Sequence, residues 1–160
     1  MIILGIDPGT SRIGYGLINS QGSCLVKHGV IETTEKDLPG KIANLTKQLR
    51  NLLEETGPEL VAIEKLYFAK NQKTALDVAQ ARGAILSICL EKNIPVAEYS
   101  PNEVKSQIAG YGLADKKAVA KMVRLILKVE SLPGYDDATD AIAVALTAAN
   151  KQRLGRGLTA

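Results

Sequence analysis

Two acidic residues stand at the ends of short apolar segments. Asp7 closes the run Ile2–Ile6 and precedes Pro8-Gly9, and Glu64 closes the run Leu60–Ile63. One acid at the end of a strand is usually only solvated, but two acids at the ends of short core strands are less common. If the two strands are neighbours in a sheet, the two carboxylates converge.

A second acidic pair lies near the start of a predicted helix. Asp137 and Asp140 are spaced i,i+3, so they project from one helix face. Asp is favoured at helix N-termini, and either Asp136 or Asp137 could simply be a cap. Capping does not account for Asp140, which precedes a face of small residues suited to close packing: Ala141, Ala145 and Ala148. Because Asp7 and Glu64 are also present, we interpret Asp137 and Asp140 as functional.

The chemistry of these four acids is that of a hard divalent cation site. Oxygen ligands without a cluster of His or Cys suit Mg²⁺ or Mn²⁺ rather than zinc. Clustered carboxylates repel one another, so a bound cation must offset the repulsion. Two ions ~3.5–4 Å apart can activate a water and stabilise the departing oxygen of a phosphodiester. The acids therefore predict metal-dependent phosphodiester cleavage, with no covalent nucleophile from the protein.

The elements that must position the acids follow an α/β order. Apolar runs and turn residues predict three strands joined by short connections, hence an antiparallel meander, and then helices alternating with two more strands. The expected strands cover residues 2–7, 13–18, 23–33, 60–64 and 95–99, and the expected helices cover residues 38–56, 73–92, 101–109, 115–128 and 136–152. We expect a mixed five-stranded sheet flanked by helices.

Composition narrows the class of protein further. The chain has 160 residues, of which 46% are hydrophobic and 23% charged, and this suits one globular domain. We expect this domain over residues 1–152, followed by a short, basic and mobile tail over 153–160. The apolar stretches are too short to span a bilayer. Cys24 and Cys89 are expected as free thiols of a cytoplasmic protein.

Ordered motifs over nearly the whole chain resemble those of a known family. They are Gly5-Ile6-Asp7-Pro8-Gly9-Thr10, Gly14-Tyr15-Gly16, Ala62-Ile63-Glu64, Phe68-Ala69-Lys70-Asn71, Gln80-Ala81-Arg82-Gly83, Val104-Lys105 and Asp137-Ala138-Thr139-Asp140-Ala141. With them the chain resembles the bacterial RuvC-type Holliday junction resolvases, members of the RNase H-like nuclease superfamily. The resemblance implies an RNase H-like fold.

The resemblance also implies an activity and partners. The family's four metal-binding, catalytic acids match Asp7, Glu64, Asp137 and Asp140. The family's D-x-x-D spacing selects Asp137 over Asp136. It implies a homodimer with two Mg²⁺-dependent sites, which nicks two strands symmetrically across a four-way junction during recombination and DNA repair. A branch-migration motor of the RuvA and RuvB type is the implied partner.

Further residues are implied to contact DNA. Tyr67 aligns with an aromatic residue thought to stack on bases near the crossover, a task that suits any exposed ring because every base offers a π-face. Phe68 is expected in the dimer interface instead. Lys105 and Lys116 match phosphate-contacting lysines of the family, and Lys70 adds positive charge after the second acid. Such contacts would position the junction without reading its sequence.

Three alternatives remain open at the level of sequence. The closest is another RNase H-like nuclease, acting on RNA–DNA hybrid or other branched DNA. The segment Ile6–Thr10 also looks like the first phosphate loop of actin- and Hsp70-like ATPases, although those proteins need two such domains and this chain is too short. A junction-binding module without catalysis is disfavoured by the four intact acids.

Overall fold

The structure, a computed structural model, describes residues 1–21, 23–66, 72–132 and 134–157. Its elements, in chain order, are β1 (Ile2–Asp7), β2 (Arg12–Asn19), β3 (Cys24–Glu32), α1 (Leu38–Thr56), β4 (Leu60–Glu64), α2 (Gln72–Glu91), β5 (Val96–Tyr99), α3 (Pro101–Ala109), α4 (Lys116–Leu127) and α5 (Asp136–Gly157). The predicted order of elements is confirmed.

The strands form one five-stranded sheet in the order β3-β2-β1-β4-β5. β1, β2 and β3 pair antiparallel, as the short connections between them require. β4 pairs parallel to both β1 and β5, each pairing following a helical crossover. The mixed sheet predicted from the sequence is thus confirmed, and the carboxyl ends of β1 and β4 lie side by side.

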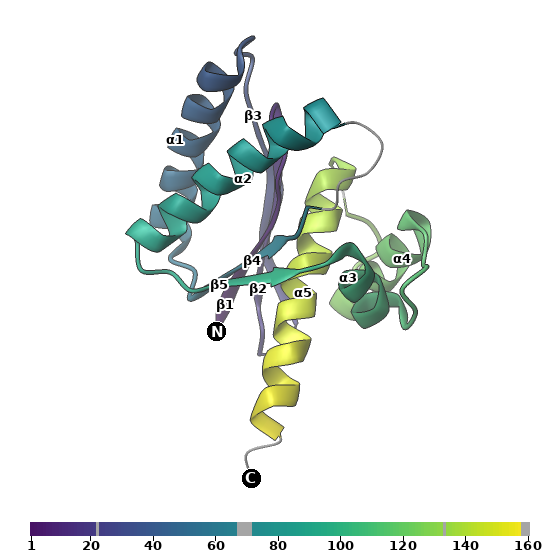
Figure 1. Cartoon of the computed structure of the whole chain (residues 1–160). Helices are drawn as coiled ribbons and strands as arrows, with labels where there is room; N and C mark the ends of the chain where they lie inside the picture. The colour runs from purple at the N-terminus through teal and green to yellow at the C-terminus, as the bar shows by residue number, and fades with distance from the viewer. Residues whose placement is uncertain (22, 67–71, 133, 158–160) are drawn as a thin grey trace.

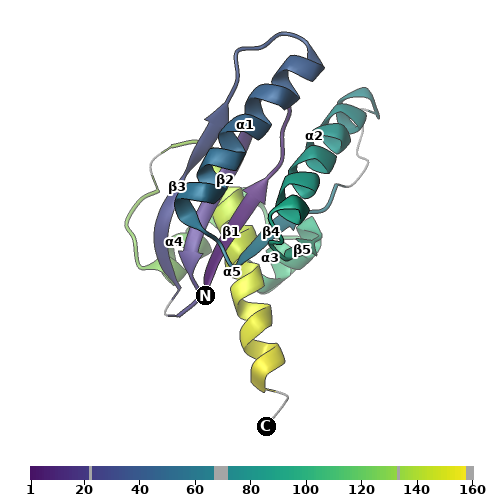
Figure 2. The same cartoon turned by 90° about the vertical axis from the view of Figure 1, so that its left-hand side faces the viewer.

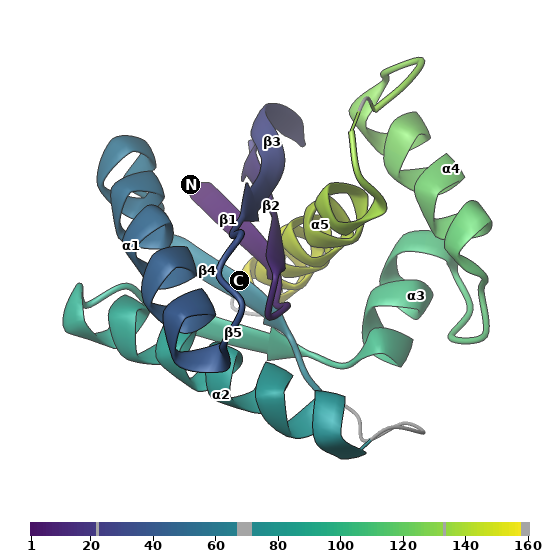
Figure 3. The same ribbon diagram turned by 90° about the horizontal axis from the view of Figure 1, so that it is seen from above.

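Each face of the sheet carries its own hydrophobic core. The residues of β1 alternate between the two faces, so that Leu4 and Ile6 join a core with α1 and α2, whereas Ile3 joins a core with α3, α4 and α5. Figure 3 shows this three-layer arrangement from above, with α1 and α2 on one side and α5, α3 and α4 on the other. The 90° view in Figure 2 shows α1 and α2 in front of the sheet, covering this face.

Helix α5 packs unusually close to the sheet because glycines face it. A Cβ atom added at Gly5 would lie 2.0 Å from the carbonyl oxygen of Ala141 and 2.9 Å from the Cβ of Ala145. One added at Gly14 would lie 2.0 Å from the carbonyl oxygen of Asp137. No side chain fits in these positions, so the small residues on both sides are what allows the contact.

Side-chain caps fix the two short helices that flank α5. Ser100 and Glu103 form a capping box at the start of α3, and Asp115 accepts a hydrogen bond from the N–H of Ala118 at the start of α4. These caps fix the starts of the helices that carry Lys105 and Lys116.

Helix α5 continues to Gly157, beyond the end predicted near Gln152. Its last turns project past the edge of the sheet (Figure 1). Lys151 donates to Glu103 at 2.7 Å, and Arg153 donates to the carbonyl oxygen of Ser20. Arg153 lies in the segment that the sequence analysis assigned to a mobile tail, whereas Lys151 lies in the expected domain. The division at residue 152 therefore does not coincide with the end of α5.

Among the described helices, none has both the length and the apolar character needed to cross a bilayer.

We predict that Gly5→Ala destabilises the protein by about 3 kcal/mol, because the new methyl group overlaps the backbone of α5 and forces the helix off the sheet. Urea unfolding measures the effect. Gly112→Ala is the matched control, since its Cβ would meet Asn102 only at an ordinary 3.5 Å, and we expect it to change the free energy of unfolding by under about 0.5 kcal/mol. Equal stabilities for the two variants would show that α5 does not need the close approach.

Candidate active site

Asp7 and Glu64 point toward the same face of the sheet from neighbouring strands. Ile6 and Ile63 are register partners in the parallel β1–β4 pair, and both are buried in the core beneath α1 and α2. Because side chains alternate along a strand, the next residue of each strand faces the opposite side, where α5 lies. The two carboxylates therefore meet at one edge of the sheet, as the sequence predicted.

Asp137 and Asp140 reach this edge from the first turns of α5. Gly14 is the register partner of Asp7, and the backbone of Asp137 lies directly against it. Ala138 and Ala141 are buried against the sheet, which fixes the rotation of the helix about its axis. The close packing of α5 thus presses this acidic pair toward the strand-borne pair.

Two adjoining hollows form a cleft at this point. Both are lined by Glu64, Pro101, Lys116 and Asp140. The larger also reaches Asp7, Pro8, Lys65 and Leu66, and the other reaches Lys105 and runs along α3 and α4. Three of the four predicted acids and two of the predicted lysines therefore line one cleft.

The acids interact electrostatically across this cleft. Burial, followed by repulsion from Asp140, Glu64 and Asp137, raises the pKa of Asp7 from 3.8 to about 7. Burial and then repulsion from Asp140 also raise the pKa of Glu64. Lys116 opposes both effects, since its positive charge lowers the pKa of Asp7 and of Glu64. All four acids thus contribute to one region of negative potential.

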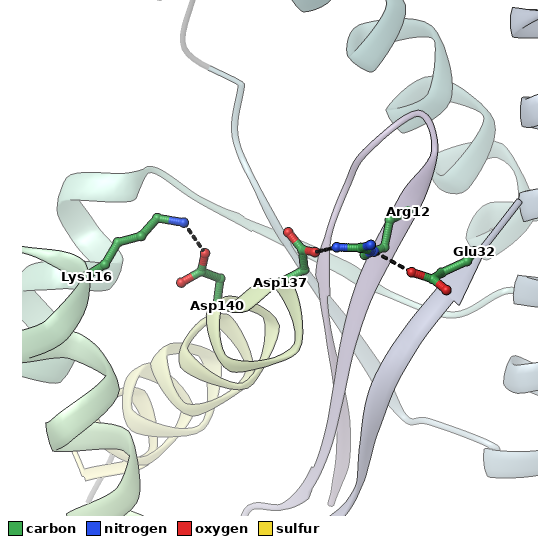
Figure 4. Close-up of polar contacts among 5 residues, drawn as sticks. All are labelled: Arg12, Glu32, Lys116, Asp137 and Asp140. Atoms are coloured by element: carbon green, nitrogen blue, oxygen red, sulfur yellow. Dashed lines mark hydrogen bonds and ion pairs between the residues drawn. The ribbon is translucent and has the colours of Figure 1, made fainter. Parts of the chain in front are cut away.

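Two cations neutralise the helix-borne acids in the free protein (Figure 4). Lys116 Nζ lies 2.9 Å from Asp140 Oδ2, and this hydrogen bond is the largest cause of the raised pKa of Lys116. Arg12 Nη1 lies 3.2 Å from Asp137 Oδ2, and its Nε lies 2.7 Å from Glu32 Oε1. The guanidinium of Arg12 therefore connects the end of β3 to the start of α5.

Within the described residues, no three His, Cys, Asp or Glu side chains are close enough together to hold one metal ion. The donor set nevertheless fits a hard divalent cation. It offers carboxylate oxygens, and the raised pKa of Asp7 records a repulsion that a cation would relieve. Lys116 and Arg12 also supply positive charge to two of these carboxylates.

Two arginines of the site were not assigned a role from the sequence. Arg12 was not singled out at all. Arg82 was noted without a specific contact, whereas in the structure its Nε donates to the carbonyl oxygen of Glu64 at 3.4 Å and its Nη2 contacts Glu98 at 2.5 Å. For Arg12, a signal was available in the sequence: it is a basic residue at the start of β2, the strand that follows Asp7.

The predicted DNA-contacting residues divide into two groups. Lys105 and Lys116 line the cleft. Tyr67, Phe68 and Lys70 lie outside the described residues, so their predicted roles stay predictions.

Comparisons with known proteins agree with one another. The family model described as "Crossover junction endodeoxyribonuclease RuvC" matches residues 3–148. A protein of that name from Petrotoga mobilis is 48% identical over 96% of this chain and 96% of its own. The solved structure of Thermus thermophilus RuvC is 34% identical, with a TM-score of 0.88 over 97% of each chain. A structure of T. thermophilus RuvC in complex with Holliday junction substrate is 31% identical, with a TM-score of 0.87 over 97% of this chain and 96% of that one. The expected RNase H-like fold is confirmed.

We predict that Asp7→Asn stabilises the metal-free protein more at about pH 8 than at about pH 5. In the folded state Asp7 keeps its proton up to about pH 7, whereas the unfolded chain loses it near 3.8, so the wild-type free energy of unfolding falls as the pH rises between these values. Asn does not titrate. The difference in the free energy of unfolding between Asp7→Asn and the wild type, the gap measured below, should therefore widen by on the order of 2 kcal/mol across this window.

Urea unfolding at the two pH values measures the gap, in the presence of EDTA. Glu130→Gln, which removes an exposed carboxylate after α4, is the control for loss of a carboxylate outside the cleft. A gap for Asp7→Asn that changes with pH no more than the gap for Glu130→Gln would contradict the electrostatic coupling of the four acids.

Proposed function

Because the chain belongs to the RuvC family of crossover junction endodeoxyribonucleases, we propose that it resolves four-way DNA junctions by paired, symmetric nicks. The observation that carries the proposal is the convergence of Asp7, Glu64 and Asp140 on one cleft, with Asp137 beside it. Burial and then repulsion from the other three acids raise the pKa of Asp7. Such a strongly perturbed acid in a cleft is typical of a functional site. The substrate of the T. thermophilus relative, a Holliday junction, is the substrate we assign to this chain.

The four acids are the proposed metal ligands and catalytic residues. RuvC-family nucleases are metal-dependent, and Mg²⁺, with Mn²⁺ as a substitute and two ions per site, is the cofactor proposed for this chain. When bound, the ions supply activation of a water and stabilisation of the departing oxygen. The protein contributes a fixed set of carboxylates, two from strand ends and two from one helix face, and needs no covalent nucleophile.

The lysines of the cleft are the proposed phosphate contacts. Lys116 is 74% exposed and forms an ion pair with Asp140. A phosphate of the bound junction offers the same ammonium group a second anionic partner. Lys105 lies along the same wall of the cleft, one helix away. Together they direct the DNA backbone toward the acids.

The wider setting is proposed by the same reasoning. Cutting two strands symmetrically requires two equivalent sites, so we assign the chain to a homodimer that acts with a branch-migration motor of the RuvA and RuvB type in recombination and repair. Tyr67 and Lys70 are proposed to contact the junction beside the cleft. Both cysteines are free in the described part of the chain, which suits the reducing cytoplasm.

The test is a cleavage assay on a four-way junction, a linear duplex and an RNA–DNA hybrid of the same sequence, with and without Mg²⁺. We expect metal-dependent cuts at symmetric positions in the junction only. Asp7→Asn should bind the junction but not cut it at any Mg²⁺ concentration. Preferred cleavage of the hybrid would favour the alternative nuclease activity and would leave the metal site intact, whereas cleavage by Asp7→Asn near the wild-type rate would remove Asp7 from the site.

We further predict that Lys105→Ala weakens junction binding and makes it less sensitive to salt. Loss of one phosphate contact should lower the slope of log K against log salt by roughly 0.9. Lys117→Ala removes the same charge from an exposed position that does not line the cleft, and it should leave the slope near the wild-type value. Electrophoretic mobility shifts at several salt concentrations measure the slope. Identical slopes for both variants would show that Lys105 acts only through overall charge.

A further inference from the structure

We propose that Arg12 is a positioning residue for Asp137, holding one carboxylate oxygen so that the other is presented to the bound metal. This inference rests on the metal site proposed above, and it gives a role to a residue outside the four acids. In this role Arg12 acts on the metal only through Asp137.

The guanidinium of Arg12 is held on three sides. Its Nε contacts Glu32 at 2.7 Å, and its Nη1 contacts Asp137 at 3.2 Å. Its carbon centre lies 3.8 Å from the centroid of the Tyr135 ring, within cation–π range. Figure 4 shows Arg12 between the two carboxylates, with the second oxygen of Asp137 turned away from it.

The backbone places Arg12, Glu32 and Asp137 near one another independently of the ion pairs. Arg12 and Glu32 are register partners in the β2–β3 pair. Asp137 is fixed by the contact of its backbone with Gly14, two residues further along β2. The strand pairing and the helix packing therefore bring a cation from one end of the chain to an acid 125 residues away.

The chemistry of a carboxylate allows it to bind Arg12 and a metal together. Ionised Asp has two oxygens with about four acceptor positions, and Arg12 uses only Oδ2. Hydrogen bonds to a metal-binding carboxylate set its orientation, and their loss typically costs 10–100-fold in metal affinity. The planar fork of Arg suits this task because it binds Glu32 and Asp137 at fixed directions, which Lys cannot do.

A purely structural role would give a different result. The side chains of Arg12 and Asp137 are 38% and 37% exposed, and ion pairs of such exposure contribute little to folding stability. A positioning role predicts a change in metal affinity without a matching change in metal-free stability. A role as a competing counter-ion predicts the opposite sign, because removing Arg12 would then tighten metal binding.

The experiment is calorimetric titration of the purified, metal-free protein with Mn²⁺. Arg12→Gln should raise the Kd about tenfold while leaving the thermal unfolding of the metal-free protein within a few degrees of wild type. Glu32→Gln should raise the Kd less, since Arg12 then keeps its contact with Asp137 but loses its own support. Arg50→Gln breaks the remote Arg50–Glu91 pair and should leave the Kd unchanged.

The double variant Arg12→Gln/Asp137→Asn tests whether Arg12 acts through Asp137. Its Kd should equal that of Asp137→Asn alone, whereas independent roles would give the product of the two single effects. If Arg12→Gln does not fold, Arg12→Lys and Glu32→Gln decide in its place, and both should weaken binding.

Three results would overturn the proposal: an unchanged Kd in Arg12→Gln, a lower Kd, or additive effects in the double variant. A wild-type protein that binds no Mn²⁺ would overturn the metal site itself, and the proposal with it. Mn²⁺ binding by the wild type with an unchanged Kd in Arg12→Gln would overturn the positioning role alone.

Discussion

The close contact between α5 and the glycine-bearing face of the sheet is the constraint on which the site depends. Gly5 leaves room for the carbonyl oxygen of Ala141 and the Cβ of Ala145, and Gly14 leaves room for the backbone of Asp137. A Cβ at either glycine would move α5 outward and carry its acids with it. The geometry of the proposed site is therefore determined by residues that have no functional group of their own.

This contact creates an electrostatic cost that local cations offset. Burial, and then repulsion from the neighbouring acids, raises the pKa of Asp7 and of Glu64 at the cleft. Arg12 and Lys116 reduce that repulsion by pairing with Asp137 and Asp140. The modest net charge of the whole chain, +3, conceals this local arrangement, because it averages an acidic centre with the basic residues around it.

The sequence predicted those features of the site that local rules determine. Alternation along strands and parallel pairing are sufficient to place Asp7 beside Glu64, and the small-residue face of α5 indicated its close packing. Arg12 and Arg82 were not assigned roles, because their contacts depend on side-chain reach between elements distant in sequence. The extension of α5 beyond Gln152 was not predicted either, since contacts of Lys151 and Arg153 with other parts of the fold support it.

The two cations of the site differ in a way that suits different tasks. Arg12 is held by Glu32, Asp137 and Tyr135, and its rigid planar group keeps these contacts at fixed directions. Lys116 is 74% exposed, has Asp140 as its ion-pair partner, and carries its charge on a flexible stem. Moving Lys116 from Asp140 to a phosphate costs little beyond one exposed ion pair, whereas moving Arg12 disrupts three contacts at once. Under the proposed function, the arrangement separates a cation that can exchange Asp140 for a phosphate from a cation that keeps Asp137 in place.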